Sequence, residues 1–194
     1  TPDGHLLASG AADQTVRLWD SLSGQCLKIL LGHDHRVPAI AWNPDGRTLA
    51  SGSHDQTVRI WNPRNGECLK ILSGHNNYVS VVAWSPDGQT LASGSGDQTV
   101  RLWDPISGEC LNVFRGHQTV VWSVSWCPDS KTLASCGADE TIKLWDILTD
   151  KCLKTLRAER PYEEMNITRI PGITEAQRAT LHVLGATGDR DRSF

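Results

Sequence analysis

The sequence predicts an all-β fold made of small antiparallel sheets that repeat along the chain. Three observations support this prediction. Similar residues recur every 42 positions, strand-like segments fill each period, and nothing within the repeats has helical spacing. Tryptophan shows the interval best, because 8 tryptophans stand beside only 2 tyrosines and 2 phenylalanines. Four of these tryptophans are each 42 residues apart: Trp19, Trp61, Trp103 and Trp145.

Residues 32–73 show how one period is organised. Four short segments, 37–42, 48–52, 57–61 and 68–72, are rich in apolar residues or alternate between polar and apolar ones. Clusters of Pro, Asn, Asp and Gly separate them, which is typical of antiparallel strands linked by tight turns. Four strands in a period of about 40–45 residues are typical of one blade of a β-propeller.

The repeats therefore predict a partial β-propeller with three complete four-stranded blades and one blade that lacks its innermost strand. The expected bounds are about 1–31, 32–73, 74–115 and 116–156. Later units carry the innermost strand directly before Pro-Asp-Gly or Pro-Asp-Ser, so we expect the missing strand just before Thr1. The chain also opens without a Met. We expect a fragment of a larger propeller or, alternatively, a ring closed by two chains.

Composition excludes several classes of function. The net charge of −3 does not favour nucleic-acid binding, and no run of apolar residues is long enough to span a membrane. The six cysteines form no C-x-x-C pair, so we expect no metal and no cofactor. Four cysteines recur with the period, which predicts buried free thiols in a reducing cytoplasm: Cys26, Cys68, Cys110 and Cys152.

The repeated motifs resemble those of the WD40 family over residues 1 to about 156. They are Gly32-His33, Gly74-His75, Gly116-His117, Trp19-Asp20, Trp103-Asp104, Trp145-Asp146 and the strings at 49–52 and 55–58. The resemblance implies a β-propeller that holds protein partners. Two departures stand out. Trp61 is followed by Asn62, and Ser130 replaces the Gly of the other turns, where we expect slight strain at positive φ.

Each complete unit contains one His, one Ser, one Asp and one Trp at matching positions. The three sets are His33, Ser51, Asp55 and Trp61; His75, Ser93, Asp97 and Trp103; and His117, Ser135, Asp139 and Trp145. Ser, His and Asp are also the residues of a catalytic triad. A triad is needed once, however, whereas this set repeats with the blade. The WD40 resemblance implies a structural tetrad of hydrogen bonds, and we expect no catalytic residue.

Positions that differ between otherwise similar units are candidates for partner binding. In WD40 proteins the positions after each Gly-His and before each corner Asp border the axial opening on one face, and that face commonly binds partners. The resemblance therefore nominates Arg36, Pro38, His54, Tyr78, Ser80, Val120 and Trp122. Aromatic residues and Arg dominate the energy of interfaces, which favours Tyr78, Trp122 and Arg36 within this set. The alternative is neutral drift in exposed loops.

The repeats stop near residue 157, and a tail follows over 157–194. Thr174 and Gln177 have the spacing of a capping box, and Gly185 suits a helix end, so we expect one short helix over about 175–184. The tail also resembles the C-terminal end of large bacterial WD40 signalling proteins, notably cyanobacterial ones. In those, an ATPase module of the STAND or NB-ARC type, or a kinase, precedes the repeats.

These observations favour a non-catalytic scaffold or sensor module, expected to be the C-terminal part of a larger cytoplasmic bacterial signalling protein. The expected partners are proteins or peptides, without nucleic acid or membrane. Further blades would come from the upstream chain or from a second copy. Two alternatives stay open: an enzyme that uses the axial pocket, and a purely structural spacer.

Overall fold

The computed structural model describes residues 1–158, 175–184 and 186–187 of the 194. The chain divides into two compact units, Thr1–Leu156 and Arg157–Phe194. The first unit contains only strands and their connecting turns. The described part of the second contains one helix, α1 (Glu175–Val183). Thr174 and Gly185, which predicted the ends of this helix, lie outside the described residues, as does most of the tail that resembles bacterial proteins.

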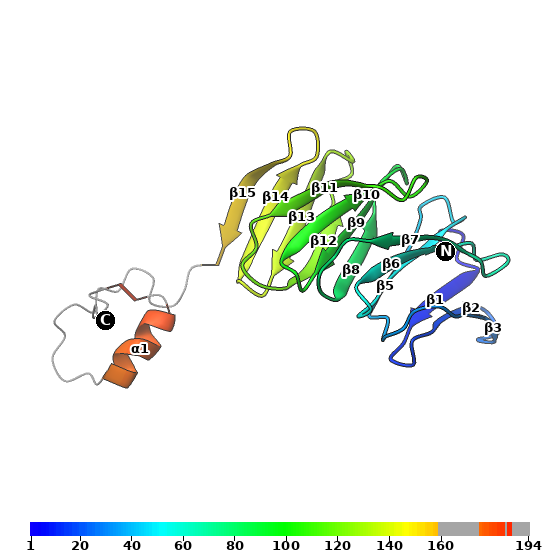
Figure 1. Ribbon diagram of the computed structural model, residues 1–194, viewed down its shortest axis with the longest axis horizontal. Coiled ribbons are helices and arrows are strands. Elements are labelled where there is room, and N and C mark those ends of the chain that lie inside the picture. The colour runs from blue at the N-terminus through cyan, green and yellow to red at the C-terminus, as the bar shows by residue number, and fades with distance from the viewer. Residues whose placement is uncertain (159–174, 185, 188–194) are drawn as a thin grey trace. The chain divides into compact units, whose positions relative to one another are not determined.

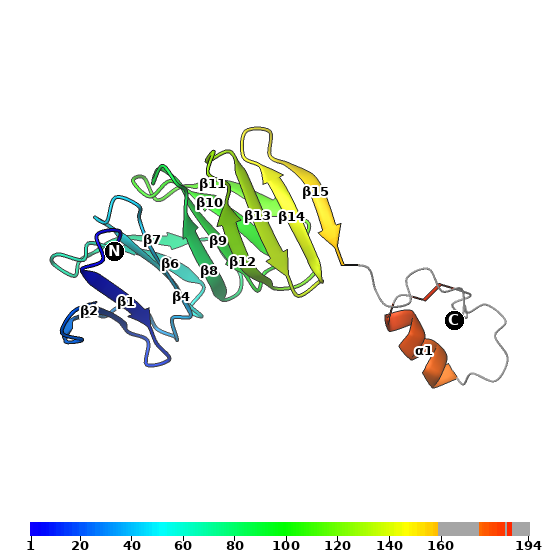
Figure 2. The ribbon, with the colours of Figure 1, turned by 180° about the vertical axis from the view of Figure 1, so that it is seen from behind.

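Four antiparallel sheets form the first unit, and each takes its strands from consecutive stretches of chain (Figures 1 and 2). Three sheets have four strands and the first has three, which confirms the predicted partial propeller. The strands are β1 (Leu6–Gly10), β2 (Val16–Asp20) and β3 (Cys26–Leu30); β4 (Ala39–Trp42), β5 (Leu49–Gly52), β6 (Thr57–Trp61) and β7 (Cys68–Ser73); β8 (Val79–Trp84), β9 (Leu91–Ser95), β10 (Thr99–Trp103) and β11 (Cys110–Arg115); and β12 (Val121–Trp126), β13 (Thr132–Gly137), β14 (Thr141–Asp146) and β15 (Lys151–Arg157).

The apolar core lies between neighbouring blades. Val58 and Leu72 of the second blade form one buried cluster with Val79 and Trp103 of the third. Similar clusters join the first blade to the second and the third to the fourth. A single four-stranded blade cannot cover its own apolar face, so stacking against the next blade removes that surface from water.

Glycine at the end of the second strand of a blade allows this close approach. A Cβ atom on Gly52 of β5 would lie 2.6 Å from Cγ1 of Val79, the first residue of the next blade's innermost strand. A Cβ on Gly94 would lie 2.7 Å from Cγ1 of Val121 in the same way. Any larger residue at these positions must displace the neighbouring blade.

Indole hydrogen bonds also link the innermost strands of neighbouring blades. The indole nitrogens of Trp84 and Trp126 donate to the backbone oxygens of Ala41 and Ala83, each over 3.1 Å. These acceptors belong to the innermost strand of the preceding blade. The equivalent nitrogen of Trp42 is buried and has no acceptor among the described residues. The acceptor is missing because the first sheet has only three strands and lacks the innermost one that would supply it.

The cysteines are not buried as the sequence predicted. All six are free, but Cys26, Cys110 and Cys152 are exposed and the other three are only half-buried. The prediction of buried thiols is therefore wrong. The recurring cysteines stand at or near the beginning of the outermost strand of each blade, where one side faces solvent. The thiol of Cys68, for example, donates to the carbonyl oxygen of Lys70 at 3.4 Å.

The turn at Ser130 has the predicted conformation. Its φ is 55°, close to the 69° and 70° of Gly46 and Gly88 at the equivalent positions.

In the described part of the second unit, Nδ1 of His182 lies 2.9 Å from the carbonyl oxygen of Ala186, just past the end of α1. No helix among the described residues is long and apolar enough to cross a membrane.

Candidate functional site

The repeated polar residues form one hydrogen-bonded chain in each complete blade. In the second blade, Nδ1 of His33 lies 2.6 Å from Oδ2 of Asp55, and Nε2 lies 2.7 Å from the hydroxyl of Ser51. The indole of Trp61 donates to the same hydroxyl at 2.7 Å. Since the indole can only donate and the carboxylate can only accept, His33 donates from Nδ1 and accepts the Ser51 proton at Nε2.

The same chain of bonds recurs in the next two blades. His75 lies 2.8 Å from Asp97 and 2.7 Å from Ser93, while His117 lies 2.9 Å from Asp139 and 2.7 Å from Ser135. Trp103 and Trp145 each donate to the serine over 2.8 Å. The structure therefore brings together all three predicted sets.

Electrostatics keep these carboxylates ionised. Burial alone would raise the pKa of Asp55, but hydrogen bonds from Thr57 and His33 outweigh it and lower the pKa to about 2. Burial is likewise outweighed at Asp97 and Asp139, whose pKa values fall well below the ordinary 3.8. Burial lowers the pKa of His33, which agrees with a neutral ring between Asp55 and Ser51.

Burial also bears on whether the serines could act as nucleophiles. Ser51 and Ser93 are 0% exposed, and Ser135 is 2% exposed. An acyl substrate has no path to an oxygen that already bonds a histidine and an indole within the blade interface. The arrangement satisfies buried polar groups. Within the described residues, no three His, Cys, Asp or Glu side chains gather closely enough to hold a metal ion.

The first blade shows the same corner without a histidine. Trp19 still donates to Ser9 at 2.9 Å. Asp13, however, pairs with Arg17 at 2.6 Å, and its side chain is 48% exposed. The corresponding Asp55 is 8% exposed. The corner carboxylate is thus enclosed in the second blade, which has both the histidine and an innermost strand, and exposed in the first blade, which has neither.

Five of the seven residues nominated for partner binding line one pocket of about 300 Å³: Arg36, Pro38, His54, Tyr78 and Trp122. Three successive blades contribute to it. Arg36 and Pro38 come from the loop before β4, His54 from the corner between β5 and β6, Tyr78 from the loop before β8, and Trp122 from β12. Residues that are far apart in sequence thus share one site.

Aromatic stacking joins two of these blades at the pocket. The rings of His54 and Tyr78 are 4.4 Å apart at an angle of 4°. Two hydrogen bonds join the loop before β4 to the corner between β5 and β6, since the carbonyl of Arg36 accepts from the His54 amide and the Ser53 hydroxyl, each at 3.0 Å. Trp122 is 55% exposed, so its ring is available to a partner. The pocket therefore combines a stacked pair of rings with an indole that is open to solvent.

The other two nominated residues lie elsewhere. Ser80 is half-buried, and its hydroxyl donates to the carbonyls of Gly94, at 3.0 Å, and Val121. Its role in the structure is to link blades. Val120 is half-buried, and its carbonyl accepts from the Ala138 amide at 2.9 Å. Neither residue lines the pocket.

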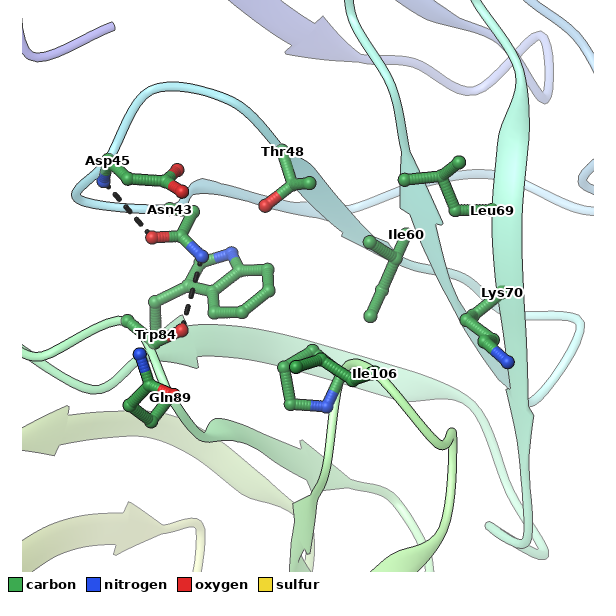
Figure 3. A pocket seen from close by; sticks show the side chains of 11 residues that line it. Asn43, Asp45, Thr48, Ile60, Leu69, Lys70, Trp84, Gln89 and Ile106 are labelled. Atoms are coloured by element: carbon green, nitrogen blue, oxygen red, sulfur yellow. Dashed lines mark hydrogen bonds between the residues drawn. The ribbon is translucent and has the colours of Figure 1, made fainter.

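Sequence reasoning missed a larger pocket of about 450 Å³ at the opposite end of the second and third blades (Figure 3). The amide of Asn43 bridges two turns there, since it donates to Gly88 at 3.2 Å and accepts from the Asp45 amide at 3.1 Å. Asn43 stands where the later blades have Ser85 and Cys127, a difference that could have indicated this site. The lining residues are Asn43, Asp45, Thr48, Ile60, Leu69, Lys70, Trp84, Gly88, Gln89, Pro105 and Ile106.

Comparison with known families agrees with the 42-residue repeat. The family model described as "WD domain, G-beta repeat" matches residues 1–20, 24–62, 66–104 and 108–146. The chain belongs to the WD40 family. WD40 repeats act as protein-interaction scaffolds, and membership of the family indicates this general function.

The curated relatives align with the chain over the length of one WD40 repeat. A stretch of 40 residues is 52% identical to nuclear distribution protein PAC1 of Mycosarcoma maydis, covering 21% of this chain and 9% of that protein. PAC1 of Cryptococcus neoformans var. neoformans serotype D is 48% identical over 40 residues, again 21% of this chain and 9% of that protein. The Lissencephaly-1 homolog of Branchiostoma floridae is 40% identical over 40 residues, 21% and 10% of the two chains. The chain thus spans about a tenth of these relatives.

Proposed function

We propose that residues 1–156 are a non-catalytic module that binds a protein or peptide partner, and that residues 157–194 are a separate tail. The observation that carries this proposal is the pocket formed by three successive blades. Its five lining residues are positions at which the repeats differ from one another, whereas the tetrads beneath them are repeated. A surface that varies on a constant scaffold is the pattern expected of a binding site.

The chemistry of the pocket supports a macromolecular partner. Trp, Tyr and Arg supply most of the energy in protein interfaces, and this pocket contains one of each. An exposed indole beside stacked rings offers apolar area and polar edges at low conformational cost. The three serines of the tetrads are enclosed, which favours binding over catalysis.

The wider setting is also part of the proposal. We infer that this chain is the C-terminal part of a larger cytoplasmic bacterial signalling protein, in which the WD40 unit senses or gathers partners. The resemblance of residues 160–186 to the ends of such proteins supports this inference. The matched relatives come from fungi and a lancelet, and each aligned stretch is the length of a single repeat. Those alignments therefore compare blades rather than whole proteins.

A random dodecapeptide library, displayed on phage and selected on the full chain, tests the proposal. The variant Tyr78→Ala/Trp122→Ala should lose most selected binders while keeping its thermal transition. A matched control is Leu22→Ala/Leu148→Ala, which truncates two side chains that are 89% and 77% exposed in turns away from the pocket. If the folded pocket variant retains the same binders as the wild type, the pocket is not the contact surface. A chain that selects no peptide would favour a structural spacer.

A further inference from the structure

The pocket that binds the proposed partner carries one formal charge. Among its five lining residues Arg36 is the only permanently charged side chain, and none is acidic. Arg36 is exposed, and its guanidinium has no ion-pair partner within 4 Å among the described residues. Arg17, by contrast, pairs with Asp13. Arg36 is therefore available to an external anion.

The other basic group of the pocket is neutral at pH 7. Burial, together with the charges of Arg36 and His35, lowers the pKa of His54 below its ordinary 6.5. His54 also stacks on Tyr78, so that its ring acts as a flat wall of the pocket. The lining thus presents one positive charge, a stacked aromatic wall and the exposed indole of Trp122.

We propose that this pocket recognises an Asp or Glu side chain of a partner peptide, with the carboxylate at Arg36 and a neighbouring apolar side chain on Trp122. The inference rests on the proposed function, because it names the chemistry of the partner at the same site. A guanidinium binds a carboxylate through two parallel hydrogen bonds. The indole and the stacked rings then cover the adjacent side chain.

Charge matching favours a carboxylate over a phosphorylated residue. A phosphate monoester carries a charge of about −1.5 to −2 and is usually held by a cluster of arginines. One guanidinium beside a neutral histidine matches a single carboxylate. Nucleic acid is disfavoured for the same reason, since the whole chain has a net charge of −3 and this pocket offers a single cation.

The dodecapeptide selection tests this inference directly. Binders to the wild type should be enriched in Asp or Glu next to an apolar or aromatic residue. Fluorescence anisotropy should then show that a selected peptide loses at least tenfold in affinity when its acidic residue becomes the amide. The variant Arg36→Glu should weaken the same peptide at least tenfold and select peptides without the acidic preference.

Arg47→Glu is the matched control, because it reverses the same charge on an exposed arginine in the turn at the other end of β5. It should leave the affinity within twofold of wild type. Binders that depend on Tyr78 and Trp122 but show no acidic preference would overturn this inference and leave the proposed function standing. A phosphoserine derivative that binds more tightly than the Glu peptide would also overturn it. If the wild-type chain selects no peptide at all, the result contradicts both this inference and the proposed function.

Discussion

Trp103 is 1% exposed and Trp122 is 55% exposed, so one substitution has different consequences at the two positions. Trp103→Ala removes the indole donor to Ser93 and opens a cavity between blades, which should lower the free energy of unfolding by about 3–5 kcal/mol. Trp122→Ala should lower it by less than about 1 kcal/mol, because little packing is lost. Urea denaturation of the two variants measures the difference. Equal losses would show that Trp122 is a core residue.

The tetrad carboxylates make stability depend on acidity. Their folded-state pKa values lie below the ordinary 3.8, so the native state holds fewer protons than the unfolded state between those values. This stabilisation is complete above about pH 4 and is lost as the pH falls through the folded pKa, which is about 2 for Asp55. Denaturation midpoints should therefore drop between about pH 4 and pH 2.

A single substitution identifies the source of that pH dependence. Asp55→Asn should reduce stability at pH 7 and flatten the slope of midpoint against pH below pH 4, because one titrating group of the native state is gone. Glu109→Gln changes an exposed carboxylate and should leave the slope as it is. An unchanged slope in Asp55→Asn would place the acid sensitivity elsewhere.

Single residues also show the limits of what the sequence can predict. The 42-residue interval places His33, Ser51 and Trp61 in the same blade, and their hydrogen bonds follow from the pleat of paired strands. The interval says nothing about which side of a strand faces solvent at its first residue, so the burial of the cysteines was predicted wrongly. Ser80 is nominated for partner binding because its position varies between the repeats, yet its hydroxyl donates to a carbonyl of the next blade.

At the scale of elements, blade spacing depends on a glycine and a valine. Gly52→Ala places a methyl group against Val79, whose side chain is 0% exposed and has no room to move. Overpacking of this kind costs roughly 1–3 kcal/mol. Val79→Ala should also destabilise the protein, because it leaves a cavity.

The two changes should compensate each other in part. In Gly52→Ala/Val79→Ala, the new methyl occupies space that the valine vacated, so the loss of stability should be smaller than the sum of the single losses. Chemical denaturation of the three variants gives the coupling energy. Strict additivity would mean that the contact between β5 and β8 does not set the blade spacing.

Contacts between elements of different blades could not be predicted from the sequence. Alternating apolar residues predicted the strands and their order within a blade. The stacking of His54 on Tyr78 depends on the distance between two blades, which no local pattern encodes. The larger pocket around Asn43 likewise arises from turns of two blades that approach each other. Five nominated residues met in one pocket because equivalent positions of successive blades share the same end of the molecule.

At the scale of the whole WD40 unit, the first sheet differs from the other three. Among the described residues β1 pairs only with β2, so its other edge presents backbone groups without a sheet partner. The buried indole nitrogen of Trp42 has no acceptor there among the described residues. Leu7 on β1 is 58% exposed. An unpaired edge beside exposed apolar side chains promotes association with another chain.

We therefore expect the 194-residue chain to associate with itself through the first sheet at micromolar concentration. Light scattering coupled to size exclusion should give a mass above the 21.3 kDa of one chain. Leu7→Lys should shift the population toward that single-chain mass, because a charge on an edge strand opposes strand pairing. Leu148→Lys is the control for added charge, because Leu148 is 77% exposed in the turn between β14 and β15. This variant should leave the measured mass unchanged. A compact, cooperatively melting monomer in the wild type would contradict this expectation, since it would mean that the edge of β1 is tolerated in water.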